Sequence, residues 1–285
     1  MIMEQRGMDQ LGVCSVLARK LLIGSMGNGL IVPEFTGSHA IFGDGIVGFI
    51  EIYSSGTLTF SKKTVVDVFV LGSGLRGATG TAMGSGDTYT GSGTATGGKG
   101  GSGAVGSVAT AVDIAPGSYS IVVGADCAST STANASSALG ITANTVRDNG
   151  GTGVYATASW NKYNLTSGSS TAGTAGANGS SIPFGVSSGG LYKLLGAGGG
   201  GGGGRAAGFE YKAGYAGGTL GGGHGGEYAS QSSQTDCTPG TANTGSGGGG
   251  GGAASYGASN LYKFTGGNGG SGLVIVRWGD WSGAA

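Results

Sequence analysis

Two short segments near residue 50 alternate apolar and polar side chains. These are residues 49–53 (FIEIY) and 57–60 (TLTF), and residues 54–56 (SSG) separate them. This alternation predicts a β-hairpin with one buried face. Apolar runs of β-type composition also occupy residues 65–71, 119–123 and 273–278. The pattern therefore predicts a small antiparallel β-framework built from N-terminal strands and one C-terminal strand.

The N-terminal stretch Leu11–Ile23 is apolar but is interrupted by Arg19 and Lys20. A secretory signal would have a basic start and an unbroken apolar run, and this segment has neither. Its leucines fall near helical spacing, which predicts a short element with one apolar face. This face would either pack on its own domain or dock on a partner, and both alternatives stay open. The residues expected to dock are Leu17, Leu21 and Leu22.

Glycine dominates the chain between the predicted strands. The 285 residues include 70 glycines but only four prolines, and the glycines occur in runs such as Gly198–Gly204. Collagen, which needs glycine at every third position and abundant proline, is therefore excluded. A disordered chain would have low hydropathy and a high net charge, whereas this chain carries apolar runs and no net charge. We therefore expect a folded protein in which glycine backbones form the packing surface.

Polyglycine-II helices would satisfy such backbones. This conformation has three residues per turn and no internal hydrogen bonds, so each helix must bond to its neighbours. Without Cβ atoms, many helices can pack side by side. We thus predict a mostly β and irregular fold, a glycine-rich polyglycine-II helix sandwich braced by the antiparallel β-framework. Residues 1–48 are assigned to an N-terminal attachment segment, and residues 49–285 to the glycine-rich domain with variable loops. The alternative for the glycine tracts is flexible linker.

Charge and cysteine content narrow the range of partners. Fourteen basic residues balance fourteen acidic ones, which predicts no nucleic-acid partner. No run approaches 18 uninterrupted apolar residues, so membrane insertion is not expected. The three cysteines are far apart in sequence, which favours neither a disulfide framework nor a zinc site.

Matches to catalytic motifs arise easily in so much glycine. Residues 72–77 spell G-x-G-x-x-G after a predicted strand, but no good helix follows. Residues 185–189 spell G-x-S-x-G without a strand–turn–helix context. His224 and Glu227 would supply only two metal ligands. We therefore predict no enzyme activity, no catalytic residue, no cofactor and no metal site.

Aromatic residues gather in two segments that we expect to be loops. Rigid aromatic rings among Ser, Gly and Asn are typical of adaptable binding loops. The alternative is that the rings cap the ends of the glycine core. The first group is Tyr155, Trp160 and Tyr163, and the second is Phe209, Tyr211, Tyr215 and Tyr228.

Three stretches carry a resemblance to known proteins. These are residues 52–60 (IYSSGTLTF), 68–72 (VFVLG) and 266–277 (GGNGGSGLVIVR), with glycine tracts between them. The combination resembles the glycine-rich proteins of bacteriophage and prophage tail modules. In design it is similar to the tip adhesins of T-even-type phages, in which a polyglycine-II sandwich carries loops that meet the host receptor.

The resemblance implies a receptor-binding tail-fibre or tail-tip protein located in the virion tail. Such a protein is made in the host cytoplasm without a signal and released by lysis. Its partners would be a bacterial surface receptor and other tail proteins, and it would be either a homotrimer or a monomer. Two alternatives remain: a purely structural fibre component without receptor contact, and a hydrolase that acts on surface glycans.

Overall fold

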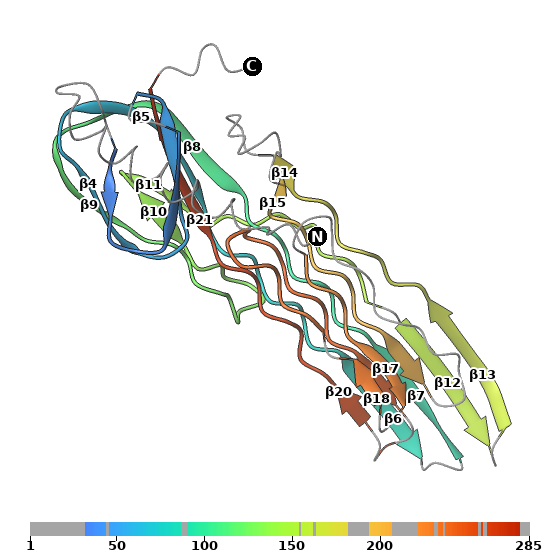
Figure 1. Ribbon diagram of the computed structural model, residues 1–285. Helices are drawn as coiled ribbons and strands as arrows, with labels where there is room; N and C mark the ends of the chain where they lie inside the picture. Colours follow the sequence, from blue (N-terminus) through green and yellow to red (C-terminus); the bar gives the residue numbers. More distant parts are fainter. Residues whose placement is uncertain are drawn as a thin grey trace, which may run out of the picture.

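The computed structural model describes most of the chain beyond residue 31. The described residues are 32–43, 46–86, 90–153, 155–161, 164–181, 194–206, 222–230, 233–235, 237–255, 258 and 261–279. Within these ranges the protein consists of strands, turns and irregular chain, with no helix. Three parts follow one another along the long axis: a β-sheet head, a bundle of glycine-rich segments and a tip of short sheets (Figure 1).

The head is built on a five-stranded antiparallel sheet of order β2-β3-β21-β5-β8. Its strands are β2 (His39–Gly43), β3 (Gly48–Ile52), β5 (Thr64–Leu71), β8 (Gly106–Ile114) and β21 (Leu273–Trp278). The C-terminal strand β21 lies between β3 and β5, where Val274 pairs with both Ile52 and Val70. This arrangement confirms the prediction of a framework made from N-terminal strands and one C-terminal strand.

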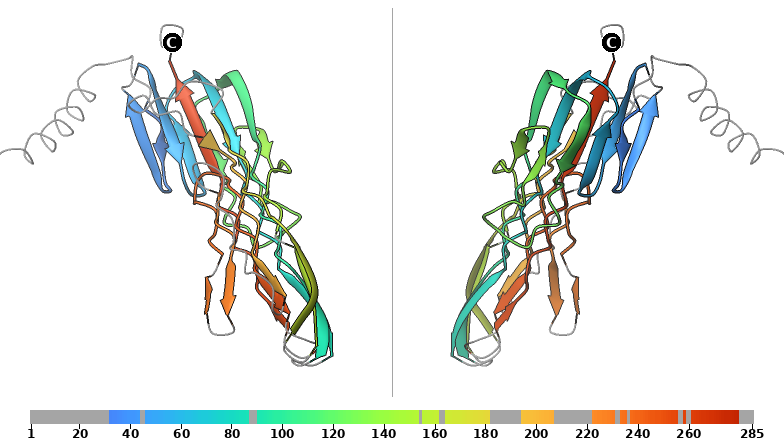
Figure 2. Two further views of the ribbon diagram at one scale, coloured as in Figure 1. Left: turned by 90° about the vertical axis from the view of Figure 1, so that its right-hand side faces the viewer. Right: turned by 90° about the vertical axis from the view of Figure 1, so that its left-hand side faces the viewer.

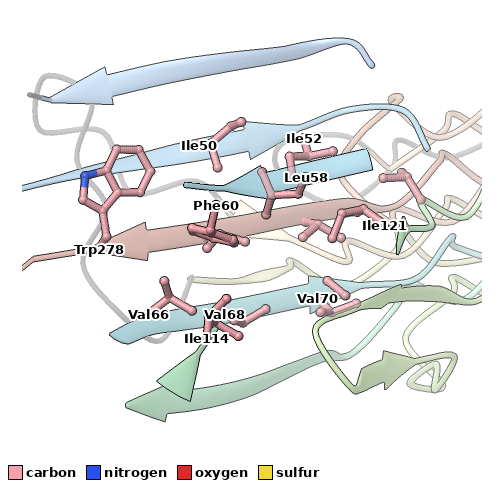
Figure 3. Packing of buried hydrophobic residues seen from close by; sticks show 14 of the residues in the cluster. Ile50, Ile52, Leu58, Phe60, Val66, Val68, Val70, Ile114, Ile121 and Trp278 are labelled. Carbon is pink, nitrogen blue, oxygen red and sulfur yellow. The ribbon is translucent and has the colours of Figure 1, made fainter. Parts of the chain in front are cut away.

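A second antiparallel sheet, of order β1-β4-β9, and the pair β10-β11 cover one face of the five-stranded sheet (Figure 3). These strands are β1 (Glu34–Phe35), β4 (Gly56–Phe60), β9 (Gly117–Ile121), β10 (Ser136–Ala138) and β11 (Ile141–Ala143). Apolar side chains from both layers meet between the sheets. Those labelled in Figure 3 are Ile50, Ile52, Leu58, Phe60, Val66, Val68, Val70, Ile114, Ile121 and Trp278.

The predicted hairpin of residues 49–60 is wrong, because β3 and β4 belong to different sheets. Every residue of β3 is buried, and both of its edges are occupied, by β2 and β21. The chain then turns near Ser54, whose Oγ accepts a hydrogen bond of 2.8 Å from the Ser38 amide. It crosses to the opposite layer, where β4 pairs with β1 and β9.

The other face of the five-stranded sheet joins the head to the glycine-rich part. Phe49, Phe69 and Ile275 are buried there together with Ala104 and Leu195. Leu195 belongs to the short pair β14 (Ser180–Ser181) and β15 (Leu194–Leu195). Because the sheet is covered on both faces, its central strands have nearly continuous apolar sequences.

Below the head, glycine-rich segments form the glycine bundle (Figure 1). Its described segments include residues 72–80, 97–105, 145–153, 172–179, 196–203, 222–226, 237–241, 245–252 and 264–272. Residues 124–134 also bond to the bundle, at segments 72–80 and 264–272. The segments bond to their neighbours through the backbone, and in several of them the partner segment repeats every third residue. In segment 72–80, the amides of Gly74, Gly77 and Gly80 donate to the carbonyls of Gly270, Gly267 and Phe264. The amides of Leu75 and Ala78 donate to the carbonyls of Ser102 and Lys99.

Segment 245–252 lies at the centre of the described bundle. Its amides donate to segments 196–203, 72–80 and 237–241, and its carbonyls accept from segments 97–105, 222–226 and 264–272. The neighbours approach so closely that a Cβ atom on Gly249 would overlap the carbonyl oxygen of His224. A Cβ atom on Gly251 would likewise overlap the carbonyl oxygen of Phe264. Glycine backbones therefore form the packing surface of this part of the molecule.

The described residues form three small sheets in the tip, at the end of the bundle opposite the head (Figures 1 and 2). The largest, of order β13-β12-β7-β6, comprises β6 (Thr81–Gly86), β7 (Thr90–Thr96), β12 (Tyr155–Asn161) and β13 (Asn164–Thr171). The second has the order β16-β19-β20, with β16 (Gly204–Ala206), β19 (Ala253–Ser255) and β20 (Leu261–Lys263). The hairpin β17 (Glu227–Ser230) and β18 (Ser233–Thr235) projects as a separate prong (Figure 2).

Candidate functional site

Two residues of the first predicted aromatic group are in a strand and not in a loop. Tyr155 and Trp160 lie in strand β12, which pairs with β7 on one side and β13 on the other. The first five residues of this strand, YATAS, alternate hydroxyl-bearing residues with alanine, which suits a strand with one exposed face. The loop prediction was wrong because alanine and threonine give only a weak alternation signal. Tyr163 lies outside the described residues.

The other predicted residues are mostly beyond the described ranges. Tyr228 belongs to the hairpin strand β17, where it pairs with Gln234. The remaining members of the second aromatic group and the docking leucines lie outside the described residues: Phe209, Tyr211, Tyr215, Leu17, Leu21 and Leu22. Their binding roles, and the domain boundary at residue 48, stay predictions.

The four-stranded tip sheet carries a regular array of hydroxyl groups on one face. Directly paired residues of antiparallel strands point to the same side, so each row of the register forms a row of side chains. One row is Thr81, Thr96, Tyr155 and Thr171, and the next is Met83, Thr94, Thr157 and Ser169. The third row begins with Ser85, Ser92 and Ser159. We call these eleven residues the hydroxyl face.

The opposite face of this sheet is covered. Ala82 and Ala95 are fully buried with Ala253 of the second tip sheet, and Leu261 packs against them. Ser255 also donates a hydrogen bond of 2.8 Å from its Oγ to the Met83 carbonyl. The two tip sheets thus form two layers, and the alternation of side chains directs the hydroxyl face outward.

Neighbouring hydroxyls on this face bond to each other. The Oγ atoms of Ser85 and Ser92 are 2.9 Å apart, and so are Thr157 Oγ1 and Ser169 Oγ. A shallow hollow of about 340 Å³ lies over the face, lined by residues of β6, β7 and β12. Met83 is 69% exposed and Tyr155 is 41% exposed, so apolar surface flanks the hydroxyls.

The hydroxyl face lies on strands without charge. None of β6, β7, β12 and β13 contains Asp, Glu, Lys, Arg or His. A larger hollow of about 680 Å³ lies on the head, beside two ion pairs. These join Lys63 to Asp113 at 3.4 Å and Arg277 to Asp67 at 2.7 Å. These charged side chains are already paired with each other. The tip is therefore the clearer candidate for binding an external ligand.

The G-x-S-x-G match at residues 185–189 lies outside the described residues. Two glycines of residues 72–77, and His224, take part in the hydrogen bonds of the bundle. The amides of Gly74 and Gly77, in the G-x-G-x-x-G match, donate to the neighbouring segment 264–272 and are therefore not directed at a ligand phosphate. The backbone amide of His224 donates to Thr238 Oγ1 at 2.7 Å within the bundle. Among the described residues, no three His, Cys, Asp or Glu side chains are grouped as metal ligands.

Tyr53 and Glu51 form a partly buried pair of titratable groups in the head. Tyr53 donates a hydrogen bond of 2.5 Å from its hydroxyl to Glu51 Oε2, and Glu51 is buried. Burial, the hydrogen bond and the nearby carboxylate all raise the pKa of Tyr53 well above its usual range. The tyrosine therefore remains neutral at physiological pH, and the pair serves the packing of the head.

No protein-family model matches the chain, and no curated protein sequence matches it. In the part of the chain that the structure describes, no helix is long and apolar enough to cross a membrane.

Proposed function

We propose that this chain is the receptor-binding protein of a bacteriophage tail fibre or tail tip. The observation that carries the proposal is the separation of the molecule into two ends. The apolar core with its ion pairs lies in the head, whereas the short sheets of the tip lie at the other end of the bundle (Figure 2). The four strands of the largest tip sheet contain no charged residue. Such a division suits a protein that attaches at one end and contacts a bacterial surface at the other.

We further propose that the bundle is a polyglycine-II lattice. Hydrogen-bond partners that repeat every third residue agree with a helix of three residues per turn. A central segment bonded to six neighbouring segments agrees with helices packed side by side. In this role the lattice fixes the strands that carry the tip before any receptor arrives. Binding then loses less conformational entropy, because the contacting residues are already ordered.

The test is competition for the host surface. The purified full chain is applied to a panel of bacterial strains, and phage adsorption is measured on the strains that it binds. We expect saturable binding to a subset of strains and a matching block of adsorption by the phage that carries the protein. Binding without a block of adsorption, or no binding to cells, would favour a structural fibre component. Release of soluble sugar from cell envelopes would favour a hydrolase.

A further inference from the structure

We infer that the hydroxyl face is a binding site for a neutral polysaccharide of the bacterial surface. The inference rests on the proposed function, since it names the ligand class that the tip would recognise. Its first support is the spacing of the hydroxyls. Adjacent strands lie about 4.8 Å apart and alternate residues about 6.8 Å apart, so the register sets the hydroxyls on a regular grid. A polysaccharide is the ligand that itself presents hydroxyls at repeating intervals.

The second support is the bonding capacity of these side chains. A serine or threonine hydroxyl has one donor and two acceptor sites. Within the described residues, the Ser85–Ser92 and Thr157–Ser169 pairs use one bond each, which leaves further donor or acceptor sites toward solvent. A sugar hydroxyl also donates and accepts, so it can bond to either partner of such a pair without leaving an unsatisfied group.

The third support comes from the absence of charge in the sequences of the four strands. Proteins bind phosphate, sulfate and carboxylate groups chiefly through Arg and Lys side chains or helix N-termini. These strands contain neither basic residue, and no helix occurs in the described residues. An acidic ligand would therefore lose its hydration on this face without gaining a basic partner. The expected glycan is uncharged.

The apolar members of the face complete the match. Tyr155 and Met83 lie two strands apart and one row apart, which places them about 12 Å from each other across the hydroxyl grid. Both expose apolar surface on which the C–H face of a sugar ring can pack. A protein partner would instead favour a larger apolar centre with several aromatic anchors. The described side chains of this face supply only these two large apolar groups.

The experiment is a binding assay of the full chain on an array of neutral and acidic bacterial-surface glycans. We expect the bound glycans to be neutral. Ser85→Lys should weaken this binding about tenfold or more, because it removes one partner of a hydroxyl pair and adds a charge. The matched control is Ser118→Lys on the head. Ser118 is also exposed and also pairs across strands, with its Oγ 2.9 Å from Thr59 Oγ1, so the control should bind normally.

A second variant distinguishes a loss of binding from a failure to fold. Tyr155→Ser removes apolar surface at the other end of the grid without adding charge, and it should weaken binding while the melting temperature stays near that of the original chain. Equal binding by all three variants would place the site elsewhere. Binding to acidic glycans alone would overturn the inference, as would self-association of the chain that Ser85→Lys abolishes.

The two proposals fail in different ways. Binding to cells without binding to any glycan would overturn the glycan site and leave the receptor-binding function standing. Binding to neutral glycans that is lost in Ser85→Lys, without any effect on phage adsorption, would support the site and overturn the adsorption role.

Discussion

Asp67 and Arg277 are 210 positions apart in the sequence and form a charge-assisted hydrogen bond of 2.7 Å between Oδ2 and Nε. They are paired residues of the adjacent strands β5 and β21. The second carboxylate oxygen, Oδ1, accepts a hydrogen bond of 2.8 Å from the Ala111 amide in β8. One side chain thus fastens the C-terminal strand and the edge strand to β5.

Replacing Asp67 with asparagine should destabilise the head. The variant loses the charge opposite Arg277, and both side chains are largely buried, with relative exposures of 21% and 15%. We expect a loss of about 1–3 kcal/mol in the free energy of unfolding. Chemical denaturation of the full chain measures it. Asp113→Asn is the control, because the Lys63–Asp113 pair is mostly exposed and should contribute less than about 1 kcal/mol. Equal effects of the two changes would contradict the bridging role.

Ala111 adopts a left-handed backbone conformation, with φ of 55°, at a bulge opposite Asp67. Such a conformation costs an L-residue about 1–2 kcal/mol, whereas glycine adopts it freely. Ala111→Gly should therefore stabilise the protein by about 0.5–1 kcal/mol after the entropy of the unfolded glycine is counted. Ala109→Gly, in the same strand at a regular ladder position, should destabilise it by a similar amount. Thermal melting measures whether each variant melts above or below the original chain. If both melting temperatures shift in the same direction, the bulge holds no such strain.

Tyr53 should make the protein sensitive to alkaline pH. Its pKa is raised in the folded state, so the unfolded chain loses this proton first as the pH rises. The stability that the neutral hydroxyl contributes is complete below about pH 10 and declines above it, toward the folded-state pKa. Denaturation midpoints at pH 8 and pH 11 measure the decline. In Tyr53→Phe the decline should be smaller, and an identical decline would exclude Tyr53 as its source.

The sequence predicts the central strands of the head well. Residues 65–71 and 273–278 form continuous apolar runs because β5 and β21 are covered on both faces, so burial marks nearly every position. The same rule explains the failed hairpin. Alternation around Glu51 suggested one face toward solvent, yet Glu51 is buried and accepts a hydrogen bond from Tyr53. Local alternation also cannot tell which sheet the next strand joins.

The tip strands escape prediction for a different reason. Their alternation is between hydroxyl-bearing residues and Ala or Gly, as in YATAS and SGTAT. These residue types differ little in hydrophobicity, so the strands resemble loop sequences. The alternation of hydroxyl-bearing residues in β7 and β12 was the one sequence signal that could have predicted these strands. The sequence cannot predict the register of the glycine bundle. Successive glycines are identical, so a shifted pairing would bring the same backbone atoms together.

The glycine bundle itself makes the sharpest stability prediction. Gly249 lies in the central segment, where its amide donates to the Thr238 carbonyl and an added Cβ would overlap the His224 carbonyl oxygen. The overlapping atom belongs to a backbone that is bonded in turn, so relief requires displacing segment 222–226. Gly249→Ala should therefore destabilise the protein by about 3 kcal/mol or more, at the upper end of overpacking effects.

The control for Gly249→Ala is Gly140→Asn at the β10–β11 turn. Nothing lies within 4 Å of the added Cβ there, and asparagine tolerates the positive φ of 86°. We expect this variant to melt within a few degrees of the original chain, while Gly249→Ala melts far lower or fails to accumulate as soluble protein. If Gly249→Ala melts as the original chain does, the glycine segments are not packed backbone against backbone. The rigid support that we propose for the tip would then be lost as well.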